Sequence, residues 1–188
     1  MLSEYLFFAE LIVWAIPPLK QFKGGYFLFF LVIAVSPFAS VLGFYLIKLI
    51  PFTVYVIASF IMLVILQYYN SGKIKFLIIT LIFPVSFIIY YNEWHYDLIS
   101  IIILHTSIVI YIIYFLLQFL YKTNSLNLYY FVLVIYEASV VLKMITFLTN
   151  IQTGKLYFYI TSIFELLIGI YFIFFNIKNS PQFKLREK

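Results

Sequence analysis

Apolar stretches of about 18 residues or more recur along almost the whole of this 188-residue chain. Such stretches are typical of helices that cross a membrane, because about 20 residues of α-helix span the hydrocarbon core. The composition agrees, since 65% of the residues are hydrophobic and 10% are charged, whereas soluble domains are about 25% charged. A soluble core in a chain of this size could not bury that excess. We therefore predict an all-α, polytopic membrane helix bundle.

Prolines and short polar segments divide the apolar sequence into seven predicted transmembrane helices. Their expected boundaries are Leu2–Leu19, Tyr26–Lys48, Phe52–Tyr69, Phe76–Tyr91, Leu98–Tyr121, Leu128–Thr149 and Leu156–Asn176. Pro17-Pro18 ends the first helix, and Pro51 marks the turn between the second and the third. This predicts a seven-helix transmembrane domain over residues 1–176 and a basic cytoplasmic tail over residues 177–188.

Lysine and arginine are distributed unevenly between the two predicted sides of the membrane. The first, third and fifth loops and the C-terminal segment hold Lys20, Lys23, Lys73, Lys75, Lys122, Lys178, Lys184, Arg186 and Lys188. The other side holds Lys48 and Lys155. Because cytoplasmic loops carry the excess of basic residues, the N-terminus is predicted outside and the C-terminus inside. This assignment requires an odd number of helices, as seven is.

The first three predicted helices resemble the last three in sequence. Phe29–Ala34 is similar to Phe131–Tyr136, and Tyr55–Leu63 aligns without gaps with Tyr159–Leu167. Helices one to three would then repeat as helices five to seven, with the fourth helix as a linker. Some transporters are built from parallel halves of this kind. The alternative is chance similarity between helices rich in Ile, Leu and Phe.

Five ionisable residues fall inside predicted helices: Glu10, His105, Glu137, Lys143 and Glu165. A charge at the centre of a membrane helix costs about 2.5–3.5 kcal/mol on insertion scales, so such residues usually face the bundle interior and pair. At about 1.5 Å per residue from the outer helix ends, Glu10, His105, Lys143 and Glu165 are expected at depths of roughly 10–14 Å. Glu137 is expected deeper, at roughly 18 Å.

Lys143 and Glu165 are the best candidates for an ion pair. Side chains lean toward the N-terminus of their own helix, so Lys143 is expected to lean toward the midplane and Glu165 toward the outside. Glu137 is six residues from Lys143, about 120° around the helix, and needs another partner or a proton. These residues either join helices as a structural network or form a site for a ligand, an ion or a proton.

Motifs of known chemistry are absent from the sequence. It has no cysteine, which excludes disulfides and iron–sulfur clusters, and no Walker A, H-E-x-x-H or G-x-S-x-G pattern. The polar segment Glu93–Asp97 contains residue types that bind metals, but we interpret it as a hydrated outer loop at an aromatic interface. No catalytic residue, metal site, cofactor or nucleic-acid partner is predicted.

Two resemblances to known families follow from these features. Short loops, the acidic Glu10 in the first helix, Tyr136-Glu137 and Phe164-Glu165 resemble the small seven-helix modules of bacteria that occur alone or with histidine kinases. The three-plus-one-plus-three layout is similar to that of the SWEET and PQ-loop transporters. The Pro-Gln signature of those transporters would fall near Pro17–Gln21, where the chain has proline without an adjacent glutamine.

The sequence leaves three functional hypotheses. The favoured one is a sensory or accessory module in the bacterial cytoplasmic membrane, which binds a small ligand within the bundle and contacts a membrane or cytoplasmic protein. The alternative is a small transporter that uses the same polar residues. The third is an intramembrane enzyme with a glutamate or histidine as general base. In each case the lipid bilayer is the surrounding partner.

Overall fold

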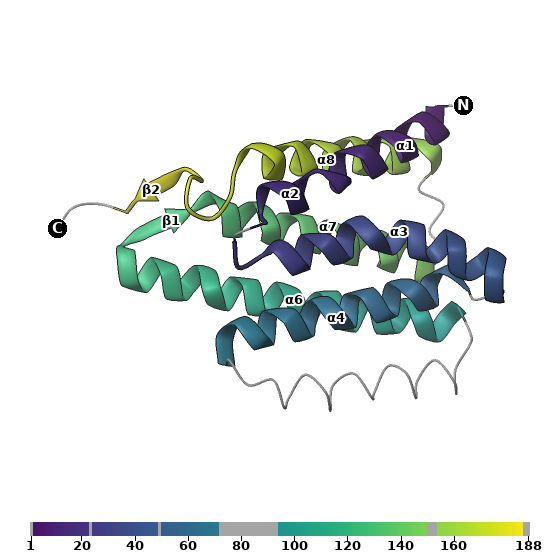
Figure 1. Cartoon of the computed structure of the whole chain (residues 1–188), viewed down its shortest axis with the longest axis horizontal. Helices are drawn as coiled ribbons and strands as arrows, with labels where there is room; N and C mark the ends of the chain where they lie inside the picture. Colours follow the sequence, from purple (N-terminus) through teal and green to yellow (C-terminus); the bar gives the residue numbers. More distant parts are fainter. Residues whose placement is uncertain (1, 23, 49, 72–93, 150–153, 186–188) are drawn as a thin grey trace.

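Helices make up almost all of the described chain (Figure 1). The computed structural model describes residues 2–22, 24–48, 50–71, 94–149 and 154–185. Its helices are α1 (Leu2–Ala15), α2 (Pro17–Lys20), α3 (Phe27–Ile47), α4 (Pro51–Ser71), α6 (Trp94–Thr123), α7 (Leu128–Leu148) and α8 (Gly154–Phe174). The strands β1 (Ser125–Asn127) and β2 (Gln182–Lys184) pair antiparallel. The predicted fourth helix, Phe76–Tyr91, lies outside the described residues.

Six of the described helices form a closed ring. In the order α1, α3, α4, α6, α7 and α8 each helix contacts the next, and α8 contacts α1. The two chain termini lie at opposite ends of this bundle (Figure 1). We call them the N-terminal end, where α1, α4, α6 and α8 begin, and the C-terminal end, where β1 pairs with β2.

The described helices indicate a membrane-embedded protein. Four of them contain segments long and apolar enough to cross a membrane: Phe27–Leu46, Pro51–Tyr68, His95–Thr123 and Leu128–Leu148. The outer surface of the ring is apolar as well, since Leu42, Ile110, Leu142 and Leu167 are each between 58% and 62% exposed. Apolar faces of this extent are stable against lipid and would be unfavourable in water.

Aromatic side chains fill the ring near its C-terminal end. Phe29, Phe30, Tyr129 and Phe172 are fully buried, and Trp14 of α1 packs on Phe30 and Phe172. Ring centroids are 4.8 Å apart for Phe30 and Phe172 and 5.2 Å apart for Tyr129 and Phe172. Each such pair contributes about 0.5–1.5 kcal/mol beyond its buried area. We call these five residues the aromatic plug.

Buried amide side chains secure the helix ends beside this plug. Gln21 is 1% exposed and donates from Nε2 to the carbonyl oxygen of Phe175 at 3.0 Å. Asn127 accepts the backbone N–H of Tyr129 at 2.9 Å as the N-cap of α7, and its Nδ2 donates to the carbonyl of Ile177 at 3.2 Å. These bonds satisfy backbone groups that helix ends leave unpaired.

The segment after α8 packs on the bundle where the sequence predicted a basic tail. In the described part, residues 177–185, Phe183 of β2 lies opposite Leu126 of β1, and the N–H of Leu185 donates to the carbonyl of Asn124 at 3.0 Å. The turn between α6 and α7 presents free backbone groups, which an adjacent extended segment can pair. The small sheet is an addition to the predicted all-α fold.

The observed helix boundaries agree with the predicted ones to within two residues for α3, α4, α7 and α8. The first predicted helix, Leu2–Leu19, is instead broken at Ile16 into α1 and α2. Pro17 has no N–H for the carbonyl four residues earlier, and its ring clashes with that turn.

The fifth predicted helix also begins earlier than expected, at Trp94 instead of Leu98. The interpretation of Glu93–Asp97 as a loop was therefore wrong for four of its five residues, Trp94–Asp97. Asp97 is 1% exposed and accepts a hydrogen bond from Thr53 Oγ1 at 2.6 Å. A carboxylate in the first turn of a helix is also favoured by the helix dipole.

Gly169 allows α8 to approach α1 closely, and its replacement tests that contact. A Cβ at position 169 would lie 2.6 Å from Val13 Cγ1 and 3.3 Å from Trp14 Cε2. Overpacking of this kind costs about 1–3 kcal/mol, which outweighs the gain of up to about 1 kcal/mol in helix propensity. We expect Gly169→Ala to lower the melting temperature of the detergent-solubilised protein by several degrees. Leu167→Ala, on the exposed face of α8, is the control and should change it little.

Candidate functional site

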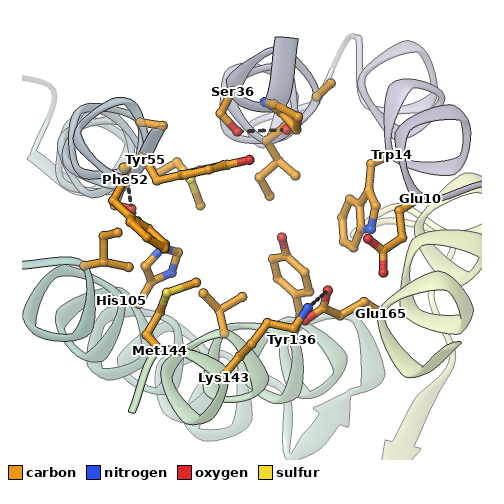
Figure 2. A pocket seen from close by; sticks show the side chains of 18 of the residues that line it. Glu10, Trp14, Ser36, Phe52, Tyr55, His105, Tyr136, Lys143, Met144 and Glu165 are labelled. Carbon is orange, nitrogen blue, oxygen red and sulfur yellow. Dashed lines mark hydrogen bonds and ion pairs between the residues drawn. The ribbon is translucent and has the colours of Figure 1, made fainter. Parts of the chain in front are cut away.

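A cavity of about 440 Å³ lies at the centre of the helix ring (Figure 2). All six helices of the ring contribute to its walls. It reaches toward the N-terminal end, where the rings of Phe52 and Phe147 pack edge to face with centroids 6.3 Å apart. On the opposite side lie Trp14 and Tyr136, whose ring centroids are 4.5 Å apart. The aromatic plug therefore separates the cavity from the C-terminal end.

The wall formed by α3 contains a proline within the helix. Pro37 lines the cavity and cannot donate the usual hydrogen bond to the carbonyl of Ile33. The hydroxyl of Ser36 donates to that carbonyl instead, at 3.2 Å (Figure 2). A serine beside the proline thus satisfies the backbone group that the proline leaves free, which lipid could not do.

The ion pair predicted between Lys143 and Glu165 is present in the structure. Lys143 Nζ lies 2.8 Å from Glu165 Oε2 and links α7 to α8. Glu10 lies close enough to both residues to interact with them electrostatically, and its side chain is hydrogen-bonded by Ser162 of α8. Figure 2 shows Glu10, Lys143 and Glu165 together on one side of the cavity. Two carboxylates and one ammonium group therefore share this wall.

A second polar group connects α4, α6 and α7 on the other side. His105 Nδ1 lies 2.5 Å from Glu137 Oε2, and His105 Nε2 lies 2.8 Å from Ser59 Oγ. Ser59 donates its own proton to the carbonyl of Tyr55 at 2.7 Å. We therefore assign a proton to His105 Nε2, with Ser59 Oγ as its acceptor.

Hydrogen bonding also fixes the charge of the His105–Glu137 pair. With Nε2 protonated, one further proton lies between His105 Nδ1 and Glu137 Oε2. If the proton is on the histidine, the pair is an imidazolium and a carboxylate; if it is on the glutamate, both groups are neutral. The net charge is zero in either case, which suits a pair that is 7% exposed at His105 and 0% at Glu137.

Four of the five predicted site residues line the cavity: Glu10, His105, Lys143 and Glu165. Glu137 does not line it and lies behind His105. The sequence placed Glu137 deeper than His105, and this was wrong. His105 is eleven residues from the start of α6 at Trp94, and Glu137 is eleven residues before the end of α7 at Leu148. Both therefore lie about 16 Å from the N-terminal end.

Two tyrosine hydroxyls were missed as site candidates. Tyr55 and Tyr136 extend into the cavity from α4 and α7 (Figure 2), and within the described part of the chain neither hydroxyl has a hydrogen-bond partner. Helical spacing is the signal that could have found them. Tyr55 is four residues before Ser59, and Tyr136 is seven before Lys143, which places each on the same helix face as another polar residue of the cavity wall.

In the described part of the chain, no three His, Cys, Asp or Glu side chains lie close enough to hold a metal ion. Comparisons with protein-family models, with curated proteins and with solved structures found no match to this chain. The functional argument therefore depends on the cavity and its lining residues.

A double-mutant cycle tests the Lys143–Glu165 pair. Lys143→Met leaves Glu165 beside Glu10 without a cation, and loss of one partner of a buried pair costs about 3–5 kcal/mol. We expect Lys143→Met to lower the melting temperature in detergent more than the double variant Lys143→Met/Glu165→Gln does. Additive effects of the two single substitutions would show that the pair contributes nothing.

A second set of variants tests the His105–Glu137 pair. Glu137→Gln can still donate a hydrogen bond to His105 Nδ1, so we expect a small loss of thermal stability. Glu137→Leu leaves that buried nitrogen unpaired and should cost about 1–3 kcal/mol. Replacing both residues with leucine should be less harmful than Glu137→Leu alone. Equal melting temperatures for the Glu137→Gln and Glu137→Leu variants would contradict a stabilising hydrogen bond between His105 and Glu137.

Proposed function

We propose that this protein is a multi-pass protein of the bacterial cytoplasmic membrane that binds a small ligand in the central cavity, as a sensory or accessory module for a partner protein. The observation that carries the proposal is a membrane-embedded cavity whose walls hold unpaired hydrogen-bonding groups. Lipid chains cannot satisfy such groups, whereas a polar ligand or water can.

The size and lining of the cavity fit a small molecule. Ligand pockets are about 300–1,000 Å³ and mostly apolar, with a few polar groups that orient the ligand. This cavity is about 440 Å³, and most of its lining side chains are aliphatic or aromatic. Its polar contacts would come from the hydroxyls of Tyr55 and Tyr136 and from the carboxylates of Glu10 and Glu165. A mostly apolar lining with a few polar groups favours a ligand with a hydrocarbon body and a polar head.

The seven-span topology, with the N-terminus outside, belongs to the same proposal. Lys20, Lys122, Lys178 and Lys184 lie at the C-terminal end of the bundle, where the positive-inside rule puts the cytoplasm. The cavity would then be reached from the cell exterior. A three-plus-one-plus-three repeat is compatible with the ring, because α1, α3 and α4 occupy one half of it and α6, α7 and α8 the other.

The aromatic plug favours binding over transport. A transported molecule has to pass between the cavity and the C-terminal end, and there Phe29, Phe30 and Phe172 are each 0% exposed. A binding module needs no such passage. A ligand bound against the plug would instead lie at the inner end of the cavity.

Thermal stability tests the proposed binding site. A ligand present at about 100 times its Kd stabilises the folded state by about 2.7 kcal/mol, which raises the melting temperature by several degrees. A small-molecule library is screened for this shift with the purified protein in detergent. Ala34→Phe, which fills part of the cavity, should abolish the shift. Val35→Phe, at the adjacent position that is 51% exposed, should leave it intact.

A second cavity-filling variant, Ala58→Leu on α4, protects the test against misfolding of Ala34→Phe. A shift that survives both substitutions, or a library without a single stabilising compound, would overturn the proposed site. Accumulation of a stabilising compound in proteoliposomes would replace the sensory hypothesis with transport.

A further inference from the structure

Two carboxylates meet at one wall of the cavity with unused hydrogen-bonding capacity. Glu165 is 8% exposed, and its Oε2 accepts from Lys143 while its Oε1 has no partner among the described residues. Glu10, on the neighbouring α1, also has a buried Oε1 without a partner in the described chain. Both residues line the cavity. Each therefore has a buried, unpaired acceptor on a side chain that forms part of the cavity wall.

The charges on this side of the cavity do not balance when both glutamates are ionised. Lys143 compensates one carboxylate, and the His105–Glu137 pair has no net charge. One negative charge then remains within a membrane-embedded bundle, where an uncompensated ion is costly. A bound cation, or a proton, removes that cost. A ligand that brings one positive charge is therefore one way to balance this wall.

Aromatic rings next to the carboxylates favour an organic cation over a metal ion. Trp14, four residues after Glu10, faces the cavity beside it (Figure 2). Tyr136 stands against Trp14 with ring centroids 4.5 Å apart. Aromatic faces attract ammonium groups, whereas a hydrated metal ion requires several oxygen ligands. The remaining walls include Met62, Met144 and other apolar side chains, which suit a hydrocarbon body.

We infer that the ligand of this cavity is a small organic monocation, an amine or quaternary ammonium compound. Its positive head lies against Glu10 and Glu165 beside Trp14, and its hydrocarbon body extends toward Phe52 and Phe147. The inference rests on the proposed function, because it names the ligand class of the same cavity.

Ligands that differ only in charge test this inference. Three ring systems (phenyl, indolyl and cyclohexyl) are each offered as the ethylamine, the corresponding alcohol and the corresponding carboxylate. Binding to the protein in lipid nanodiscs is measured by calorimetry and by thermal shift. We expect at least one amine to bind at least about tenfold more tightly than its alcohol and carboxylate analogues.

Matched variants connect that preference to the carboxylates. Glu10→Gln, which breaks no ion pair, should weaken amine binding by about tenfold or more. Lys143→Met/Glu165→Gln removes one carboxylate together with its cation, so the wall keeps one uncompensated negative charge and the preference for amines should persist. Asp97→Asn changes a buried carboxyl group that is bonded to Thr53 and does not line the cavity, so amine affinity should be unchanged.

The outcomes separate this inference from the proposed function. Tighter binding of alcohols or carboxylates, abolished by Ala34→Phe, would overturn the cation inference and leave the binding site in place. Amine binding that is unaffected by Glu10→Gln would overturn it as well. If none of the charge-matched compounds binds, the organic-cation inference is wrong, whereas the proposed function fails only if the wider library is also inert.

Discussion

Polar side chains inside an apolar helix bundle must find partners within the protein, because lipid offers none. Here those partners connect neighbouring helices of the ring. In order around it the contacts are Ser59–His105 between α4 and α6, His105–Glu137 between α6 and α7, Lys143–Glu165 between α7 and α8, and Glu10–Ser162 between α1 and α8. The helix α7 carries two of them on flanks about 120° apart, since Glu137 and Lys143 are six residues apart. One helix thus positions both of its neighbours.

The sequence predicts the helices well because membrane helices leave a strong local signal in hydropathy. It predicts their ends poorly where a polar residue is buried. Asp97 was assigned to a hydrated loop because it belongs to the polar segment Glu93–Asp97 at an aromatic interface. Only the tertiary contact with Thr53, 44 residues earlier, makes its position in α6 favourable. The pairing of β1 with β2 was equally inaccessible, because it depends on which segments the ring brings together.

The two buried pairs of the site show the same limit of prediction from sequence. Lys143 and Glu165 were predicted because they lie on consecutive helices and lean toward each other. His105 and Glu137 were both recognised but not paired, because starting α6 four residues too late moved His105 by about 6 Å. The regular spacing of Leu98, Ile101 and His105 on α6 could have shown that His105 lies on the buried face of this helix.

The aromatic plug lies between the cavity and the C-terminal end of the bundle. Any effect of a bound ligand on that end would therefore have to pass through the plug. Trp14 belongs to the cavity wall and also packs on Phe30 and Phe172. Phe172 in turn packs on Tyr129, whose N–H donates to Asn127, the last residue of β1 and the N-cap of α7. A ligand changes a distant surface only if it binds two arrangements of the intervening groups with different affinity. Within the proposed binding function, Trp14 is therefore the residue that connects the cavity wall to these aromatic contacts.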